Sequence, residues 1–89
     1  MSSITLAFSS SRVEPLSALS DGARGVIVDV HAADAGRTDR LLALGVTPGA
    51  RVVVLQTFPG VVFLCDQTEL AVERGVAASI LVRVEELRP

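Results

Sequence analysis

The sequence predicts a mainly β fold, a small barrel of five short strands with one or two short helices. The apolar segments are short and rich in Val, Ile and Leu, and β-branched residues favour a half-buried pleated sheet. Turns that contain Gly, Pro or Asp separate these segments closely. No long helical segment stands between neighbouring strands, and parallel strands would need one as a crossover.

The chain is expected to form one domain over residues 15–86, with residues 87–89 as a C-terminal tail. Residues 1–14 are predicted to be a flexible segment or an added edge strand. The apolar patch Ile4–Phe8 leaves both alternatives open, whereas the Ser-rich run Ser9–Arg12 favours a flexible tail.

The domain is predicted to begin with a helical turn and a strand. Leu16–Gly22 carries leucines three apart and suits one helical turn that leads into a tight turn. In Ala23–His31, three valines alternate with residues of mixed polarity: Val26, Val28 and Val30. This period of two predicts a strand with one firmly buried face.

Arg37–Leu44 is predicted to form a short amphipathic helix, because its three leucines fall on adjoining faces. Gly45 follows directly and can take the left-handed conformation that ends a helix, since it has no Cβ. Thr47–Ala50 is predicted to be a tight turn. Pro48 presets the first central φ of that turn, and Gly49 tolerates a positive φ at the second.

Four more strands and a second helical segment are predicted in the second half of the chain. The connections are a hairpin loop at Phe58–Gly60 and a turn at Asp66–Thr68. The predicted helical segment is Arg74–Ser79, one or two turns long. The predicted strands are Arg51–Thr57, Val61–Cys65, Glu69–Glu73, with Leu70 and Val72 pointing inward, and Ile80–Val84.

The composition narrows the classes of function. The chain has 89 residues, a net charge of -2, three Phe and no Trp or Tyr. A nucleic-acid-binding domain would need a basic surface and stacking aromatics, so that class is not expected. A single Cys excludes an internal disulfide and a cysteine zinc cluster, and fits a reducing compartment. No signal peptide is expected, and no segment approaches the ~20 apolar residues of a membrane span.

No arrangement of residues points to catalysis. An enzyme would need a nucleophile with a base, or paired carboxylates, and the chain offers one His, one Cys and scattered acids without a motif. Cys65 and His31 are the candidate metal ligands, because thiolate and imidazole both bind first-row transition metals. The alternative is a small buried thiol at a strand end and an exposed imidazole beside another strand.

Four segments carry a resemblance to the FeoA family. They are LSAL..G at Leu16–Gly22, the strand that ends in Val28–Val30, RLLALGVTPGARVVV at Arg40–Val54 and ELAVERGVAASILV at Glu69–Val82. The most specific part is Leu-Gly-x-x-Pro-Gly, which here ends at Gly49. The resemblance covers about residues 15–85 and implies a Src homology 3-like barrel. The chain departs from the family at Asp66–Thr68, where members often have a glycine.

The resemblance implies a cytoplasmic accessory protein of bacterial ferrous iron uptake. Its implied partner is the FeoB membrane permease with a GTPase domain, which it would contact from the inner face of the cell membrane. The alternative is a metal-sensing module that binds Fe(II) or another transition metal ion directly, and homo-oligomerisation stays open.

The expected partner surface is the predicted helix and the turn after it. Small barrels can bind another chain through exposed rims and strand edges. Leu41 and Leu44 are three apart and share a face, which is core if it is buried and an interface if it is exposed. The expected partner-binding residues are Arg37, Arg40, Leu41, Leu44, Gly45, Pro48 and Gly49.

Overall fold

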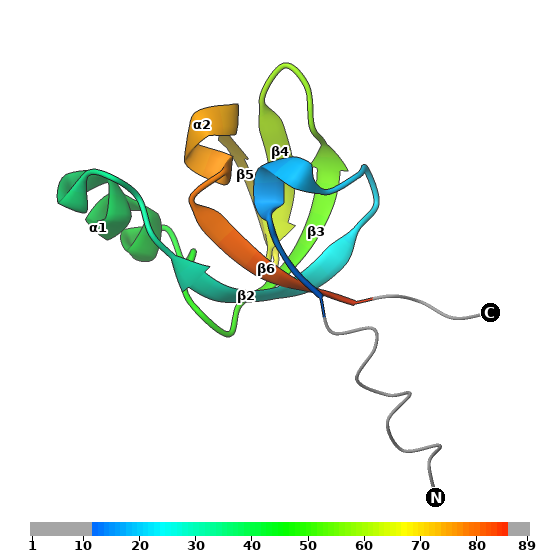
Figure 1. Ribbon diagram of the computed structural model, residues 1–89, viewed down its shortest axis with the longest axis horizontal. Helices are drawn as coiled ribbons and strands as arrows, with labels where there is room; N and C mark the ends of the chain where they lie inside the picture. Colours follow the sequence, from blue (N-terminus) through cyan, green and yellow to red (C-terminus); the bar gives the residue numbers. More distant parts are fainter. Residues whose placement is uncertain (1–11, 86–89) are drawn as a thin grey trace, which may run out of the picture.

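Six antiparallel strands form a single curled sheet in the computed structural model, which describes residues 12–85 (Figure 1). The strand order is β1-β6-β2-β3-β4-β5. The strands are β1 (Arg12–Pro15), β2 (Arg24–Val30), β3 (Arg51–Gln56), β4 (Val61–Cys65), β5 (Thr68–Val72) and β6 (Ile80–Glu85). The helices are the 3-10 helix η2 (Leu16–Ala18), α1 (Ala35–Ala43) and α2 (Arg74–Ala77). The mainly β fold with short helices is confirmed.

The sheet has one strand more than the five predicted, and no pairing between β1 and β5 closes it within residues 12–85. The additional strand, β1, pairs with β6 from Arg12 opposite Val84 to Pro15 opposite Leu81. No residue of β1 is fully buried, and its Val13 is 49% exposed. Backbone pairing with β6, and not a buried apolar face, therefore holds β1 in the sheet. Residues 1–11, which include the patch Ile4–Phe8, and residues 86–89 lie outside the described part.

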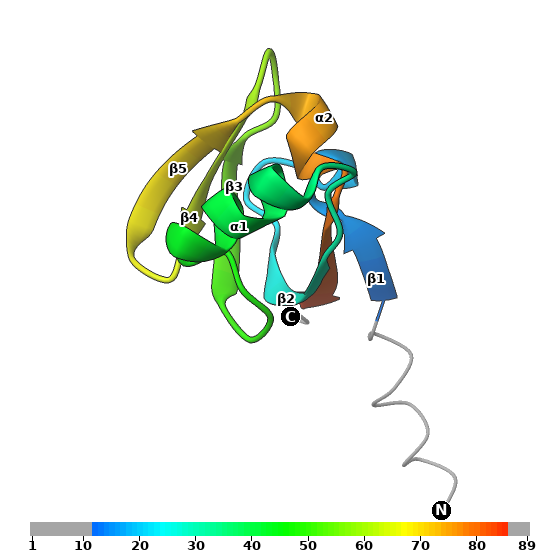
Figure 2. The same cartoon turned by 90° about the vertical axis from the view of Figure 1, so that its left-hand side faces the viewer.

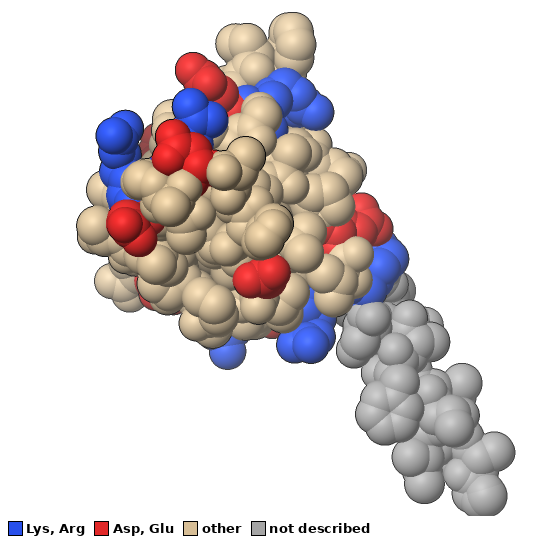
Figure 3. Space-filling view, turned by 60° about the vertical axis from the view of Figure 1, so that its left-hand side comes forward, with Lys and Arg blue, Asp and Glu red and all other residues tan. Residues whose placement is uncertain are grey.

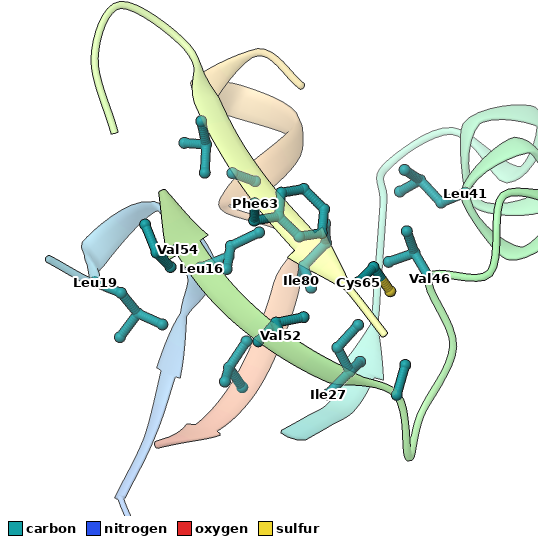
Figure 4. Packing of buried hydrophobic residues seen from close by; sticks show 14 of the residues in the cluster. Leu16, Leu19, Ile27, Leu41, Val46, Val52, Val54, Phe63, Cys65 and Ile80 are labelled. Carbon is teal, nitrogen blue, oxygen red and sulfur yellow. The ribbon is translucent and has the colours of Figure 1, made fainter. Parts of the chain in front are cut away.

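The core lies inside the curl of the sheet (Figure 4). Phe63 of β4 is completely buried, and the neighbouring strand β3 buries Val52 and Val54 against the same cluster. Leu16 of η2 covers one side of the core, and Leu41 reaches in from α1. Burial alternates along β3 and β4, as a period of two requires.

The buried face of β2 is the face of Gly25 and Ile27, while Val26 and Val28 are only partly buried. Apolar residues occupy both faces of this strand, so the alternation alone did not identify the inner one. Gly25 lies where the backbone of β6 approaches closely. A Cβ at this position would stand 2.3 Å from the Arg83 carbonyl oxygen, so only glycine fits.

Helix α1 begins two residues earlier than predicted, because Asp34 caps it. The Asp34 carboxylate accepts a hydrogen bond from the Gly36 N–H at 2.8 Å, which satisfies one of the free amides of the first turn. At the other end Gly45 has φ +95°, as predicted. The Val46 N–H donates to the Leu41 carbonyl at 3.0 Å, and both side chains are buried, so the helix end is a Schellman motif with its hydrophobic contact.

The turn after α1 connects the helix to the sheet. Gly49 has φ +97°, and the Ala50 N–H donates to the Thr47 carbonyl at 3.0 Å, which confirms the predicted turn. The Gly49 N–H donates to the Ile27 carbonyl at 2.8 Å, and the Ile27 N–H donates to the Ala50 carbonyl at 2.9 Å. These two bonds hold the turn against β2, so the position of α1 is set by the sheet.

Helix α2 is held in place by the side chain of Arg74. Its guanidinium donates to the Thr57 carbonyl at 2.5 Å and to the Ser17 carbonyl at 3.1 Å. One side chain therefore joins α2, η2 and the β3–β4 loop. In Figure 1 these three segments lie in the upper half of the molecule.

Candidate functional site

A groove of about 270 Å³ lies between α1 and the corner where β5 leads into α2. We call it the α1–β5 groove. In Figure 2, α1 lies in front of the sheet and β5 lies at the edge of the sheet. The α1 wall consists of Arg37, Arg40, Leu41 and Leu44, and the opposite wall consists of Ala71, Val72, Glu73 and Val76.

The leucines of the α1 wall do not share one environment. Leu41 is 4% exposed and belongs to the core, whereas Leu44 is 50% exposed. The expectation that their common face is either core or interface is therefore wrong, because the helix lies at the margin of the core. Leu44 is the C-cap residue, where the chain turns away from the sheet at Gly45, and its side chain is left in contact with solvent.

Arg37 and Arg40 are exposed at the rim of the groove. Neither guanidinium takes part in an ion pair or hydrogen bond among the residues that the structure describes. Their charges are therefore available to a ligand. Arg40 also lies in the last turn of α1, where a cation interacts favourably with the helix dipole.

The structure brings together four of the seven expected partner-binding residues. Gly45, Pro48 and Gly49 do not line the groove. The two glycines have positive φ, and with exposed Pro48 they form the helix end and the turn that follow α1. Their direct role is to position the α1 wall.

The opposite wall was not identified from the sequence. The alternation in β5 correctly placed Leu70 and Val72 toward the core and left Ala71 as an ordinary exposed residue. Its position beside α1 depends on the strand order, which local periodicity does not contain. Val76, a partly buried residue of α2, completes the wall.

The two candidate metal ligands differ in environment. Cys65 is 3% exposed, and its thiol donates a hydrogen bond to the Gly45 carbonyl at 3.3 Å. Burial raises the pKa of this thiol, and the nearby Asp66 carboxylate raises that pKa further. His31 is exposed after the end of β2. Within residues 12–85, no three His, Cys, Asp or Glu side chains lie close enough to hold a metal ion.

Asp66 adopts φ +55°, at the turn where family members often have a glycine. Aspartate tolerates the left-handed region better than most residues. Its carboxylate accepts a hydrogen bond from the Arg51 N–H at 3.1 Å, and its own N–H donates to the Arg51 carbonyl at 2.7 Å. These contacts hold the β4–β5 hairpin against β3 without a glycine.

On the side that carries α1, most of the surface consists of uncharged side chains, with acidic and basic groups scattered around it (Figure 3). Across residues 12–85, no helix has the length and apolar character that crossing a membrane would require.

The comparisons with known proteins agree on one family. A family model described as the FeoA domain matches residues 14–84. The chain is similar to the crystal structure of an iron uptake regulatory protein (FeoA), with 28% identity and a TM-score of 0.74, over 83% of this chain and 100% of that chain. It is similar to the FeoA protein from Chlorobium tepidum, with 33% identity and a TM-score of 0.71, over 79% of this chain and 69% of that chain.

A similar fold also occurs within longer regulators. A manganese-dependent transcriptional repressor has 20% identity and a TM-score of 0.77, over 84% of this chain and 43% of that chain, and this likeness shows the fold alone. No curated protein matches the chain significantly.

Proposed function

This chain belongs to the FeoA domain family, and on that premise we propose that it is an accessory protein of bacterial ferrous iron uptake. It acts by binding the cytoplasmic part of a FeoB-type permease through the α1–β5 groove. The observation that carries the proposal is the α1 wall, where Arg37 and Arg40 have no ion-pair partner among residues 12–85 and lie beside half-exposed Leu44. An apolar contact with charged groups at its rim is typical of a protein-binding surface.

The test is capture of the permease from membranes by the purified chain. The double variant Arg37→Ala with Arg40→Ala should keep its melting temperature within a few degrees, because exposed charges contribute only 0 to ~1 kcal/mol to stability. Capture should fall by about tenfold or more, since an interface arginine can contribute more than ~1 kcal/mol to binding. Growth that depends on ferrous iron should slow in parallel.

The matched control is Arg24→Ala with Arg83→Ala. Both arginines are exposed, they lie on β2 and β6, and neither lines the α1–β5 groove. This control removes the same amount of charge and should capture the permease like the wild type. Equal capture by the groove variant and the control would contradict the assignment of the surface.

Direct metal sensing is the competing function, and an anaerobic titration with Fe(II) tests it. We expect no saturable signal that depends on Cys65, because its buried thiol has a raised pKa and a metal ligand must be the thiolate. A stoichiometric signal that disappears in both Cys65→Ser and His31→Ala would favour sensing over the proposal.

A further inference from the structure

The α1–β5 groove runs along a free strand edge. β5 is the last strand of the sheet and pairs only with β4 in the described part of the chain. Ala71 and Val72 are neighbours in β5, so their side chains point to opposite faces, yet both line the groove. The groove therefore borders the edge of the strand and not one face of the sheet.

The outward backbone groups of this edge can be assigned from the hairpin. β4 and β5 are joined by a two-residue turn, so the first pair, Cys65 and Thr68, is hydrogen-bonded. Bonded and non-bonded pairs then alternate along the antiparallel ladder. Glu69 and Ala71 accordingly direct their N–H and C=O groups away from β4. No backbone hydrogen bond outside the ladder uses a residue of β5 within residues 12–85.

The size of the groove suits a side chain better than a small-molecule ligand. Its volume of about 270 Å³ is below the ~300–1,000 Å³ typical of ligand pockets. Leu44 and Val76 provide apolar surface on its two sides. One apolar side chain of a bound segment would cover both of them.

The charges of the groove are arranged asymmetrically. Arg37 and Arg40 stand on the α1 wall without an ion-pair partner among the described residues, while Glu73 stands on the opposite wall. A carboxylate two residues from the apolar side chain, and so on the same face of an extended segment, would be attracted toward α1 and repelled from Glu73. Charge complementarity thus favours an acidic segment and sets its orientation.

We propose that the α1–β5 groove binds an extended acidic segment of the partner, which pairs with the outer edge of β5. The backbone of the segment bonds to Glu69 and Ala71, and an apolar side chain enters between Leu44 and Val76. Carboxylates two residues away, on the same face of the segment, contact Arg37 and Arg40. This mode is β-strand addition, in which backbone bonds give affinity and alternate side chains give specificity. The inference rests on the proposed function for the identity of the partner and adds the chemistry of the recognised segment.

The test uses the full chain and a capped synthetic heptapeptide with Leu at its centre, Glu two residues before and two residues after it, and Thr at the other positions, so that Leu and both carboxylates share one face. Two derivatives of this peptide are compared. One carries N-methyl groups on the backbone amides of the odd-numbered residues, and the other carries them on those of the even-numbered residues. Strand addition uses the amides on one side only, so one derivative should bind at least tenfold more weakly than the other. Amide NMR shifts should concentrate at Glu69, Ala71 and α1.

Variants test the charge component of the inference. Arg37→Gln with Arg40→Gln should weaken binding of the peptide at least fivefold, and Arg24→Gln with Arg83→Gln should change it less than twofold. A peptide with Lys in place of Glu should bind at least tenfold more weakly than the acidic one.

Three results would each overturn the inference: equal binding of the two N-methylated peptides, equal binding of the acidic and basic peptides, or no binding at millimolar peptide. Permease capture without any peptide binding would reject strand addition and leave the proposed function standing. Peptide binding with the expected register, together with no capture of the permease, would reject the proposed function and leave this inference standing.

Discussion

Gly45 ends α1 through its backbone conformation alone. Its φ is +95°, and a Cβ added there would meet no heavy atom within 4 Å. Substitution therefore tests strain without a steric clash. Gly45→Val should lower the free energy of unfolding by more than ~1 kcal/mol, because a β-branched residue resists positive φ.

The control for this prediction is Gly45→Asn, since asparagine populates the left-handed region more readily and should cost less than valine. Denaturant unfolding of both variants measures the difference. An unchanged stability in Gly45→Val would contradict the role of this glycine in ending the helix.

The Cys65 thiol should make stability depend on pH only in alkaline solution. Burial raises its pKa above the ordinary value of 9.0, so the folded chain keeps this proton longer than the unfolded chain. Below pH 9 both states are protonated and the contribution is constant. Above pH 9 the unfolded state loses its proton first, and stability should fall by at most ~1.4 kcal/mol per pH unit until the raised pKa is passed.

The composition allows the titration of Cys65 to be separated from that of other side chains, because all eight basic side chains are Arg and the chain has no Tyr. No Lys or Tyr therefore titrates in the same range. Cys65→Ala should remove the slope above pH 9 in urea unfolding. A slope that persists in this variant would assign the effect to another group.

Helix α1 is attached to the sheet by one side of its surface. Leu41 is 4% exposed and Leu44 is 50% exposed, although they are only three residues apart. Leu41→Ala should cost ~2–5 kcal/mol, as expected for a cavity in a packed core. Leu44→Ala should cost less than ~1 kcal/mol, because it removes surface that is already half in water.

Thermal unfolding of the two variants provides the comparison, and permease capture should show the opposite order. Leu44→Ala should weaken capture while the fold stays intact. If both leucines proved equally costly to stability, α1 would be packed more deeply than its burial pattern indicates.

Arg74 connects three elements that lie far apart in the chain. Its guanidinium donates to the Thr57 and Ser17 carbonyl oxygens, at 2.5 and 3.1 Å. Arg74→Ala should lower the free energy of unfolding by ~1–2 kcal/mol. Two buried hydrogen bonds from a charged group would contribute more, but Arg74 is exposed and water weakens both bonds.

Arg74→Lys keeps the charge but cannot reproduce the fork of two donors, so it should recover only part of the loss. Hydrogen exchange of the β3–β4 loop amides should become faster in both variants. Exchange at the wild-type rate in Arg74→Ala would show that the loop is held by other contacts.

The sequence predicted the individual helices, strands and turns better than their assembly into the sheet. Turn chemistry located the helix end at Gly45 and the turn at Gly49, because positive φ requires particular residue types. The inner face of β2 could not be predicted, since Ile27 and the neighbouring valines make both faces apolar. β1 was not counted because backbone pairing with β6 leaves no apolar pattern.

The same distinction applies to the candidate site. The α1 wall could be predicted, because Arg37, Arg40 and the leucines belong to one short helix. The wall from Ala71 to Val76 depends on β5 being the last strand of the sheet, and strand order comes from pairing between distant segments. The Src homology 3-like fold itself was reached through family resemblance and agrees with the FeoA structures.

The hydrogen bond between the Cys65 thiol and the Gly45 carbonyl joins β4 to the end of the groove helix. Because Cys65 is 3% exposed, a thiol-specific reagent can reach its sulfur only after the surrounding structure opens, and separation of that end of α1 from the sheet is one such opening. The ratio of its alkylation rate to that of an unprotected thiol therefore measures how often this part of the fold opens. Cys65 can therefore report on local opening next to the proposed binding surface. A segment bound in the α1–β5 groove should slow the alkylation of Cys65 without contacting this residue.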